Sequence, residues 1–348
     1  MPAFATRGRL GSWRALLVCV LAAALAASCA RREPERRFAT IFQSACSVTI
    51  YDRPSEETFA AVWARLREID EMMNMWKEDS DLSRLNAAAG TGALAVPVEI
   101  LAALGHALAL CDLSGGRYDP TVGPLVKLWG VGTPRARVPG DREIEAALAL
   151  LDRGAVRIDT VAGTVELGRA GMVLDFGSVA KGFGVVEAGR ILSERGVKSA
   201  IADLGGCILA LGSNPSGDRW RIGIQDPSAT RGSSNVGYFL ARDAAVATSG
   251  SYERRFVEDG RSYHHIMDTA TGYPVDNILV SVTVLVDRDA NPDGPPLALF
   301  ALGPDKGLAM ADDLGLAAVF IQEGRRLRVS KAAKAIFVKT ASSYLLVQ

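Results

Sequence analysis

Apolar and polar positions repeat along this chain with two different periods. Over residues 55–75, apolar residues recur every three to four positions, which predicts an amphipathic helix beginning at Ser55. Helices are also predicted over residues 97–113 and 141–151. After Gly154 the pattern changes to short β-rich runs, interrupted by one helix over residues 179–195. A helix-rich first part and a strand-rich remainder predict an α+β fold, formed by one compact domain with two lobes.

Strands are predicted where β-branched and aromatic residues cluster between turn residues. The first covers residues 38–51, and two short helices are expected near residues 297–301 and 306–314, before closing strands. The other predicted strands are residues 156–158, 164–167, 172–174, 200–202, 207–211, 220–224, 236–240, 263–267 and 278–286.

The N-terminus resembles a bacterial export signal. Three arginines within residues 7–14 precede residues 15–27, which carry no charged side chain. This run is too short to span a bilayer as a mature helix, but it fits the apolar core of a signal peptide. Small residues then lead to Cys29, as in a lipobox, although the leucine stands four residues before the cysteine instead of three.

We therefore expect a lipoprotein-type signal peptide over residues 1–28, lipidation of Cys29, a charged tether over residues 29–37 and a folded domain over residues 38–348. The protein would be exported and anchored to a membrane, inner or outer, facing the periplasm. Ordinary cleavage beside Ser28 is the alternative.

Composition excludes two classes of function. The 39 basic and 39 acidic residues cancel, so no net basic charge favours nucleic acid as a partner. Besides Cys19 and Cys29, three widely spaced cysteines remain, and no cysteine pair or cysteine–histidine cluster has the spacing of a zinc site.

Two glycine-rich segments could bind an anion. Residues 174–184 predict a strand, a glycine turn and the start of a helix, where free backbone N–H groups suit a pyrophosphate and Lys181 adds positive charge. Residues 245–254 predict a strand that ends in a hydroxyl-rich glycine turn. An ordinary tight turn explains either segment about equally well.

Two of the three histidines are adjacent, at His264 and His265. Neighbours in a strand point to opposite faces, so the pair is not expected to bind one metal ion together. His265 is our candidate for a general base, and Asp268 follows it into a turn. A histidine with a nearby aspartate is suited to accepting a hydroxyl proton.

Taken together and in chain order, these segments resemble the ApbE family, the FAD:protein FMN transferases formerly called thiamine biosynthesis lipoproteins. The resemblance covers the chain from about residue 40 to its end, through seven segments. They are residues 80–86 (SDLSRLN), 118–130 (YDPTVGPL then LWG), 175–182 (DFGSVAKG), 204–206 (LGG), 220–227 (WRIGIQDP), 247–250 (ATSG) and 264–268 (HHIMD).

The resemblance implies an ApbE-like α+β fold related to the T-fold. It also implies FAD as substrate, bound between the lobes, and Mg²⁺ at the pyrophosphate. A Thr or Ser hydroxyl of an acceptor flavoprotein would attack the FMN phosphorus, and AMP would be released. The implied flavin and FAD contacts are Tyr118, Asp119, Thr121, Lys181, Phe183, Thr248, Ser249, Gly250 and His265; the implied metal ligands are the Ala180 carbonyl and Asp293.

The sequence departs from the family pattern at three places. Gln43-Ser44-Ala45 stands where the family has Met-Gly-Thr on its first strand. Val186 replaces an aspartate usually near FAD, with Glu187 one residue further on. Leu297 replaces a threonine metal ligand four residues after Asp293, and a leucine cannot coordinate a hard cation. The alternatives are therefore a FAD-binding lipoprotein that has lost catalysis and a FAD pyrophosphatase.

Overall fold

A nine-stranded sheet forms the centre of the molecule. The computed structural model describes residues 33–230 and 232–347, so the predicted signal peptide and Cys29 lie outside it. Neighbouring strands of this sheet run antiparallel, except that the last two are parallel. In spatial order the strands are β1 (Glu35–Ile41), β2 (Ser44–Ile50), β6 (Ser199–Leu204), β7 (Ile208–Gly212), β10 (Ala244–Gly250), β13 (Leu279–Asp287), β14 (Ala317–Gln322), β15 (Arg326–Val329) and β17 (Leu345–Leu346).

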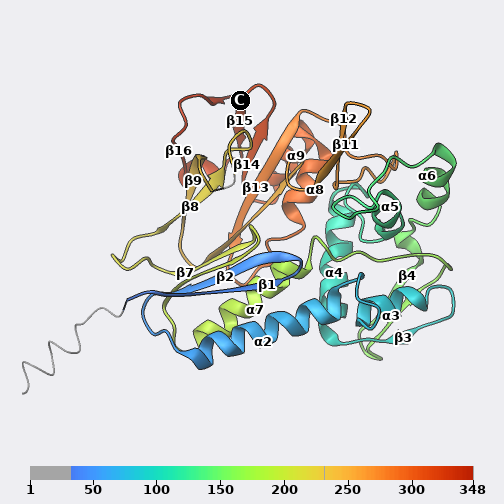
Figure 1. The fold of residues 1–348 in the computed structure, drawn as a ribbon, viewed down its shortest axis with the longest axis horizontal. Helices are drawn as coiled ribbons and strands as arrows, with labels where there is room; N and C mark the ends of the chain where they lie inside the picture. The colour runs from blue at the N-terminus through green and yellow to red at the C-terminus, as the bar shows by residue number, and fades with distance from the viewer. Residues whose placement is uncertain (1–32, 231, 348) are drawn as a thin grey trace, which may run out of the picture.

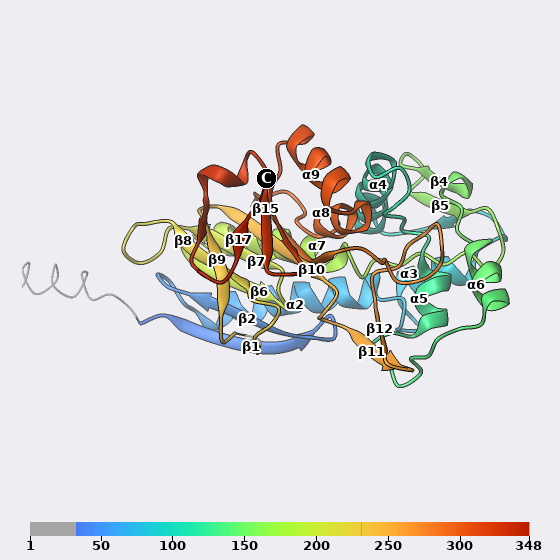
Figure 2. The ribbon, with the colours of Figure 1, turned by 90° about the horizontal axis from the view of Figure 1, so that it is seen from above.

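Four helices cover one face of this sheet: α2 (Glu56–Met73), α7 (Ala180–Glu194), α8 (Pro295–Leu302) and α9 (Pro304–Asp313). In Figure 1, α2 and α7 run side by side along the lower edge, and Figure 2 shows the arrangement from above. Helix α2 begins as predicted, because the Ser55 hydroxyl accepts a hydrogen bond from the Thr58 N–H at 3.2 Å. Its buried side chains, including Leu66, recur at helical spacing.

A small antiparallel sheet covers the opposite face. Its strands are β8 (Trp220–Gln225), β9 (Asn235–Ala241) and β16 (Phe337–Lys339), with β9 in the middle. Successive residues of β14 alternate between the two cores: Ala318 and Phe320 face the helices, and Val319 and Ile321 face the small sheet. This alternation explains why residues 317–321 of the strand are all apolar.

The second lobe lies on the right of Figure 1. A separate hydrophobic cluster of this lobe forms around Trp129. Trp129 is fully buried and donates its ring N–H to the Gly272 carbonyl at 2.8 Å. The elements of this lobe and its connections are α3 (Asp81–Ala87), β3 (Leu94–Ala95), α4 (Val98–Leu113), α5 (Gly123–Trp129), α6 (Asp141–Leu148), η1 (Arg153–Ala155), β4 (Val156–Asp159), β5 (Thr164–Leu167), β11 (Arg255–Glu258) and β12 (Arg261–His264), while η2 (Ala333–Ala335) precedes β16.

The α+β class is confirmed, but several boundaries differ from the prediction. The expected first strand is a hairpin, split by a turn at Phe42 and Gln43, both with φ of 54°. Glu35–Arg37, expected in the tether, belong to β1. Residues 172–174 form one isolated bridge instead of a strand. Within residues 33–230 and 232–347, no helix is long and apolar enough to cross a membrane.

The core between α2 and the sheet gives a test of the fold. Leu66 is fully buried, whereas its neighbour Arg67 is exposed. Leu66→Ala should lower the free energy of unfolding by about 2–5 kcal/mol because it leaves a cavity, and Arg67→Ala should change it by less than about 0.5 kcal/mol. Urea denaturation measures both values. A loss below about 1 kcal/mol for Leu66→Ala would contradict the packing described here.

Candidate functional site

The Asp293 carboxylate lies against the first turn of α7. Its Oδ2 atom accepts the Gly182 N–H at 3.2 Å and faces the Lys181 ammonium group at 3.3 Å. Burial alone would lower the pKa of Lys181, but the negative charge of Asp293 reverses the effect and the pKa is raised. The first turn of a helix, with its free N–H groups and partial positive charge, is a favourable place for a carboxylate. The resemblance implies that Lys181 contacts FAD and that Asp293 binds the metal ion. In the structure the two side chains also form an ion pair with each other.

Asn291 fixes the loop that carries Asp293. Its side-chain amide donates to the Val179 carbonyl at 3.1 Å, and its Oδ1 atom accepts the Asp293 N–H at 3.0 Å. The loop comes so close to α7 that a Cβ atom at Gly182 would lie 1.8 Å from Asn291 Oδ1. Only glycine permits this approach. Asn291 was not among the predicted site residues, and its position two residues before Asp293 was the only sequence signal for it.

One further contact holds Asp293 from the side of α4, and the next residue turns the chain into α8. His106 places Nε2 at 3.5 Å from the Asp293 carbonyl oxygen, and burial lowers the pKa of this histidine. Gly294 follows with a φ of 89°, a left-handed value that favours glycine, and caps the start of α8. The two prolines that begin α8 occupy its first turn, where they are tolerated.

Tyr118, Asp119 and Thr121 form a closed loop beside α7. Tyr118 is buried, its pKa is raised by burial, and its hydroxyl oxygen accepts a hydrogen bond from Ser178 at 3.1 Å. Thr121 is fully buried and donates both its backbone N–H and its hydroxyl group to Asp119 Oδ1, at 2.8 and 2.7 Å. In this structure Tyr118 and Thr121 therefore shape the loop from within, and Asp119 is the half-buried member of the three.

Positive charge gathers around Asp175. Burial raises the pKa of its carboxyl group, while the nearby charges of Arg254, Lys181 and Lys127 act in the opposite direction. These cations come from three separate segments of the chain. The sequence pattern identified only Lys181 among them, because nothing in the local sequence links Lys127 or Arg254 to the glycine turn.

A small cavity of about 290 Å³ lies between the end of α2 and the segment after α5. Trp76, which is 40% exposed, lines it together with Lys127 and Arg135. An exposed tryptophan beside two cations is suited to stacking against a planar anionic ligand. Trp76 was not predicted as a site residue, although it follows directly after the helical apolar pattern ends.

The two histidines have different surroundings, although only His264 lies in a strand: β12 ends at His264, and the strand predicted over residues 263–267 is not formed in full. His264 Nδ1 accepts the Ile266 N–H, so its Nε2 carries the proton and donates to the Val275 carbonyl at 3.0 Å. His265 Nδ1 lies 3.3 Å from the Arg254 carbonyl, an acceptor, which requires the proton on Nδ1 and leaves the Nε2 lone pair free. His265 therefore has the tautomer of a general base, while His264 is held on both nitrogens.

The expected pairing of His265 with Asp268 is not formed. Asp268 Oδ1 accepts hydrogen bonds from Arg117 at 2.9 Å and from the Ala270 N–H at 2.8 Å, so the carboxylate stabilises its own turn. The carbonyl oxygen of Arg254 orients His265 in its place. An Asp at the start of a tight turn accepts the backbone N–H two residues further on, and this local preference outweighs the pairing expected from sequence distance.

The predicted hydroxyl-rich turn is also different. Thr248, Ser249 and Gly250 are the last residues of β10 and pair with β13, so the turn begins only at Ser251. The Thr248 hydroxyl shares a hydrogen bond with Thr283 at 2.9 Å. Phe183, another predicted contact, packs against the main hydrophobic core.

The departures at α7 and α8 have structural explanations. Glu187 bonds to Arg65 at 2.8 Å and to Arg190, and these cations lower its pKa despite its partial burial. It belongs to an ion-pair network on α2 and α7, and so does not replace the carboxylate missing at Val186. Leu297 packs at the junction of two hydrophobic clusters.

The residues present fit a magnesium ion only as part of a shared coordination shell. No group of three His, Cys, Asp or Glu side chains within the described ranges could hold a metal ion. Asp293 Oδ1, however, takes part in no hydrogen bond among these residues, and the Ala180 backbone lies at the start of the same helical turn. One carboxylate and one carbonyl suit Mg²⁺, which takes its remaining ligands from phosphates and water.

Comparison with known proteins identifies the family. The model of the ApbE family matches residues 42–320, and the chain belongs to this family. The FAD:protein FMN transferase of Treponema pallidum is 35% identical over 340 residues, which are 91% of this chain and 93% of that protein. The one from Vibrio cholerae is 36% identical over 250 residues, 71% of this chain and 74% of that protein.

The fold agrees with a solved structure of the same family. The flavin transferase ApbE from Vibrio cholerae superposes with a TM-score of 0.79 at 30% sequence identity, covering 87% of this chain and 99% of that one. The resemblance identified from seven ordered segments, and the α+β single-domain fold expected from it, are confirmed.

Gly182 gives a direct test of how α7 and the Asp293 loop fit together. Gly182→Ala places its Cβ 1.8 Å from Asn291 Oδ1 and 2.8 Å from Asp293 Cβ. It should lower the free energy of unfolding by about 1–3 kcal/mol, as overpacking does. Gly105→Ala, on α4 with nothing within 4 Å, should leave it unchanged or raise it by about 0.5–1 kcal/mol. Equal stabilities in chemical denaturation would show that the contact is not tight.

His265 should titrate far below an ordinary histidine. Burial lowers its pKa to about 4, and the charge of Arg254 acts in the same direction. The neutral ring should persist at pH 5, and its contribution to stability, complete above about pH 6.5, should be lost as the pH falls towards 4. NMR titration of the ring protons, assigned with His265→Gln, measures the midpoint. A midpoint near 6.5 would be inconsistent with this environment.

Proposed function

We propose that this protein is a Mg²⁺-dependent FAD:protein FMN transferase, which moves FMN from FAD to a Thr or Ser hydroxyl group of an acceptor protein. The observation that carries the proposal is the Asp293 carboxylate seated on the Gly182 N–H and the Lys181 ammonium group at the start of α7. Family membership and relatives named FAD:protein FMN transferase support the activity.

The cations have a direct use in this reaction. A pyrophosphate carries two negative charges that must be neutralised while a phosphorus–oxygen bond breaks. Lys181, Arg254 and Lys127 supply that charge around Asp175. Trp76 offers its exposed ring to a planar group of FAD at the edge of the same region.

His265 is our choice for the proton acceptor. Its free Nε2 takes the proton of the acceptor hydroxyl group as the hydroxyl oxygen forms a bond to the FMN phosphorus. The bond between that phosphorus and the bridging oxygen breaks, and AMP leaves with the bridging oxygen. The product is an FMN phosphoester on the acceptor, so all atoms of FAD and of the hydroxyl group are accounted for.

Asp293 and the Ala180 carbonyl would hold the magnesium ion. When bound, Mg²⁺ would neutralise phosphate charge and favour departure of AMP. Lys181 now occupies one oxygen of the carboxylate. Since Leu297 supplies no third ligand, phosphate oxygens and water would complete the shell.

The cellular location is part of the proposal. The signal-peptide pattern and Cys29 support an exported lipoprotein that faces the periplasm, with an acceptor flavoprotein as its partner.

Transfer can be distinguished from its alternatives in one assay. The mature protein is incubated with FAD, Mg²⁺ and an acceptor domain that carries a suitable Thr. AMP is quantified, and flavin fluorescence is measured on the acceptor band of a denaturing gel. We expect both signals, only when acceptor and metal are present, and Asp293→Asn should reduce the rate by about a hundredfold or more, since metal catalysis supplies several kcal/mol.

Each other outcome has a defined meaning. FAD binding without AMP under any divalent metal would leave a flavin-binding lipoprotein, consistent with Leu297. AMP with free FMN in the absence of acceptor would indicate a pyrophosphatase. Leu297→Thr is the matched gain-of-ligand variant: it should strengthen the dependence on Mg²⁺, and an unchanged metal requirement would mean that position 297 does not face the ion.

A further inference from the structure

A second cavity lies at the opposite end of α7 from Asp293. It measures about 1260 Å³ and we call it the N-terminal groove. Its walls are residues 33–34 at the beginning of the described chain, the β2–α2 loop, the turn between α7 and β6, the loop after β7 and the β9–β10 turn. Helix α7 has 15 residues, so about 20 Å separate the groove from Lys181.

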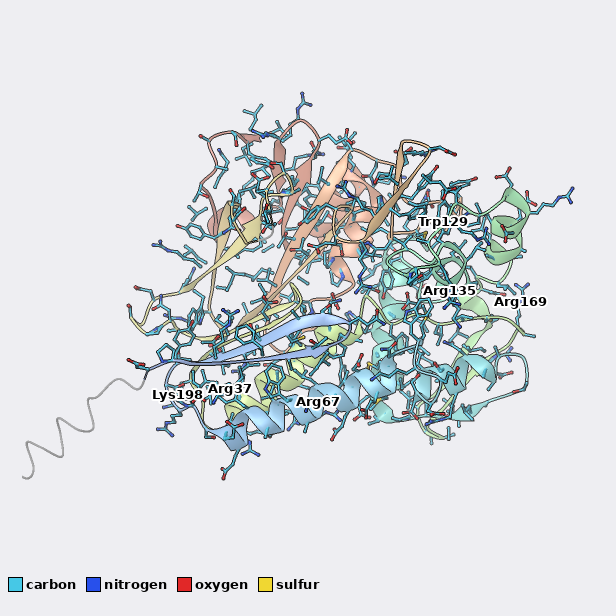
Figure 3. The ribbon with its side chains drawn as sticks, in the orientation of Figure 1. Arg37, Arg67, Trp129, Arg135, Arg169 and Lys198 are labelled. Atoms are coloured by element: carbon cyan, nitrogen blue, oxygen red, sulfur yellow. The ribbon has the colours of Figure 1, made fainter. Side chains whose placement is uncertain are left out.

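Four exposed cations line this groove: Arg53, Arg195, Lys198 and Arg242. Within residues 33–230 and 232–347, Arg53, Arg195 and Lys198 form no side-chain hydrogen bond or ion pair, and Arg242 bonds only to the Gly217 carbonyl. Their charges are therefore available to an outside partner. In Figure 3, Lys198 is labelled beside the start of the described chain, whereas Arg135 and Arg169 lie towards the other lobe.

Two acidic residues of the groove are already engaged. Asp52 accepts the backbone N–H groups of Lys198 and Ser199 at 3.0 and 3.2 Å, one on each carboxylate oxygen. Asp243 Oδ1 accepts the Gly212 N–H at 3.0 Å and lies 3.3 Å from Arg288. Both carboxylates keep their negative charge, so with Glu33 the lining has three anions against four cations, a small positive excess in a chain without net charge. The cations are the groups without a partner, whereas Asp52 and Asp243 are held by backbone N–H groups.

The position of the groove, near Cys29 in the sequence, indicates that it faces a membrane surface. Glu33, which lines it, stands four residues after Cys29. Four residues span at most about 14 Å when fully extended. A lipid on Cys29 would therefore hold the groove within reach of the phosphate layer of the bilayer. We propose that the N-terminal groove binds anionic phospholipid headgroups and orients the protein on the membrane, with the Asp293 site directed away from it.

This inference rests on the proposed anchor for its geometry, but its test does not need the lipid. The mature chain from Ala30 without lipid keeps every described element, and it can be floated with vesicles of phosphatidylcholine alone or with 30% phosphatidylglycerol. Binding should occur on the anionic vesicles and disappear in 0.5 M salt, which screens surface charge. Mass spectrometry of Cys29 tests the anchor separately, and the transfer assay tests the enzyme.

Charge-matched variants show whether the groove itself is responsible. Arg53→Glu with Lys198→Glu should weaken binding by about tenfold or more, given the contribution of each cation near an anionic surface. Arg67→Glu with Arg135→Glu makes the same charge change at exposed residues outside the groove and should stay within about twofold. Arg53→Gln with Lys198→Gln, which only neutralises the two charges, should be intermediate.

Three results would overturn the proposal. The first is equal binding of the wild-type protein to neutral and anionic vesicles. The second is equal weakening by the two charge-reversal variants, which would make binding a matter of net charge. The third is complete displacement by millimolar glycerol phosphate, which would show a site for a small soluble anion instead of a membrane surface.

Discussion

The contact between the Asp293 carboxylate and the first turn of α7 is the constraint on which the site depends. It joins two segments more than a hundred residues apart, through the backbone N–H of Gly182 and the side-chain ammonium group of Lys181. The approach requires a residue without a side chain at Gly182 and a fixed loop at Asn291. Because a carboxylate at a helix N-terminus is stabilised by the helix itself, this charge can remain buried without a full set of cationic partners.

The second lobe completes the site from the other side. The loop that contains Asp119 is closed from within by Thr121, and the Ser178 hydroxyl at the α7 turn bonds to Tyr118. Tyr118 and Thr121, which the resemblance assigns to the flavin side, thus also support this loop from within. The charges of Lys127, Lys181 and Arg254 lie around Asp175, and the ring of Trp76 is 40% exposed.

Sequence reasoning was most successful where one segment contains all the information. The Ser55 cap and apolar spacing of α2, and the glycine turn that starts α7, lie within short windows. It failed where a distant neighbour decides. Residues 248–250 look like a turn, yet β13 pairs with them and extends the strand. Asp268 looks like a partner for His265, yet Arg117 and its own turn bind it first. Arg254 bonds to His265 through its backbone carbonyl, and a backbone contact cannot be predicted from the type of residue at that position.

The order of strands in the large sheet affects how the chain folds. Strand β2 pairs with β1 on one side and with β6, which ends at Leu204, on the other. The N-terminal hairpin therefore has no second partner until more than half of the chain has been synthesised. Contacts between such distant segments slow folding, because a long loop must close before they form. The large sheet is therefore completed only late in synthesis, because its edge strand β17 lies at Leu345–Leu346, close to the end of the sequence.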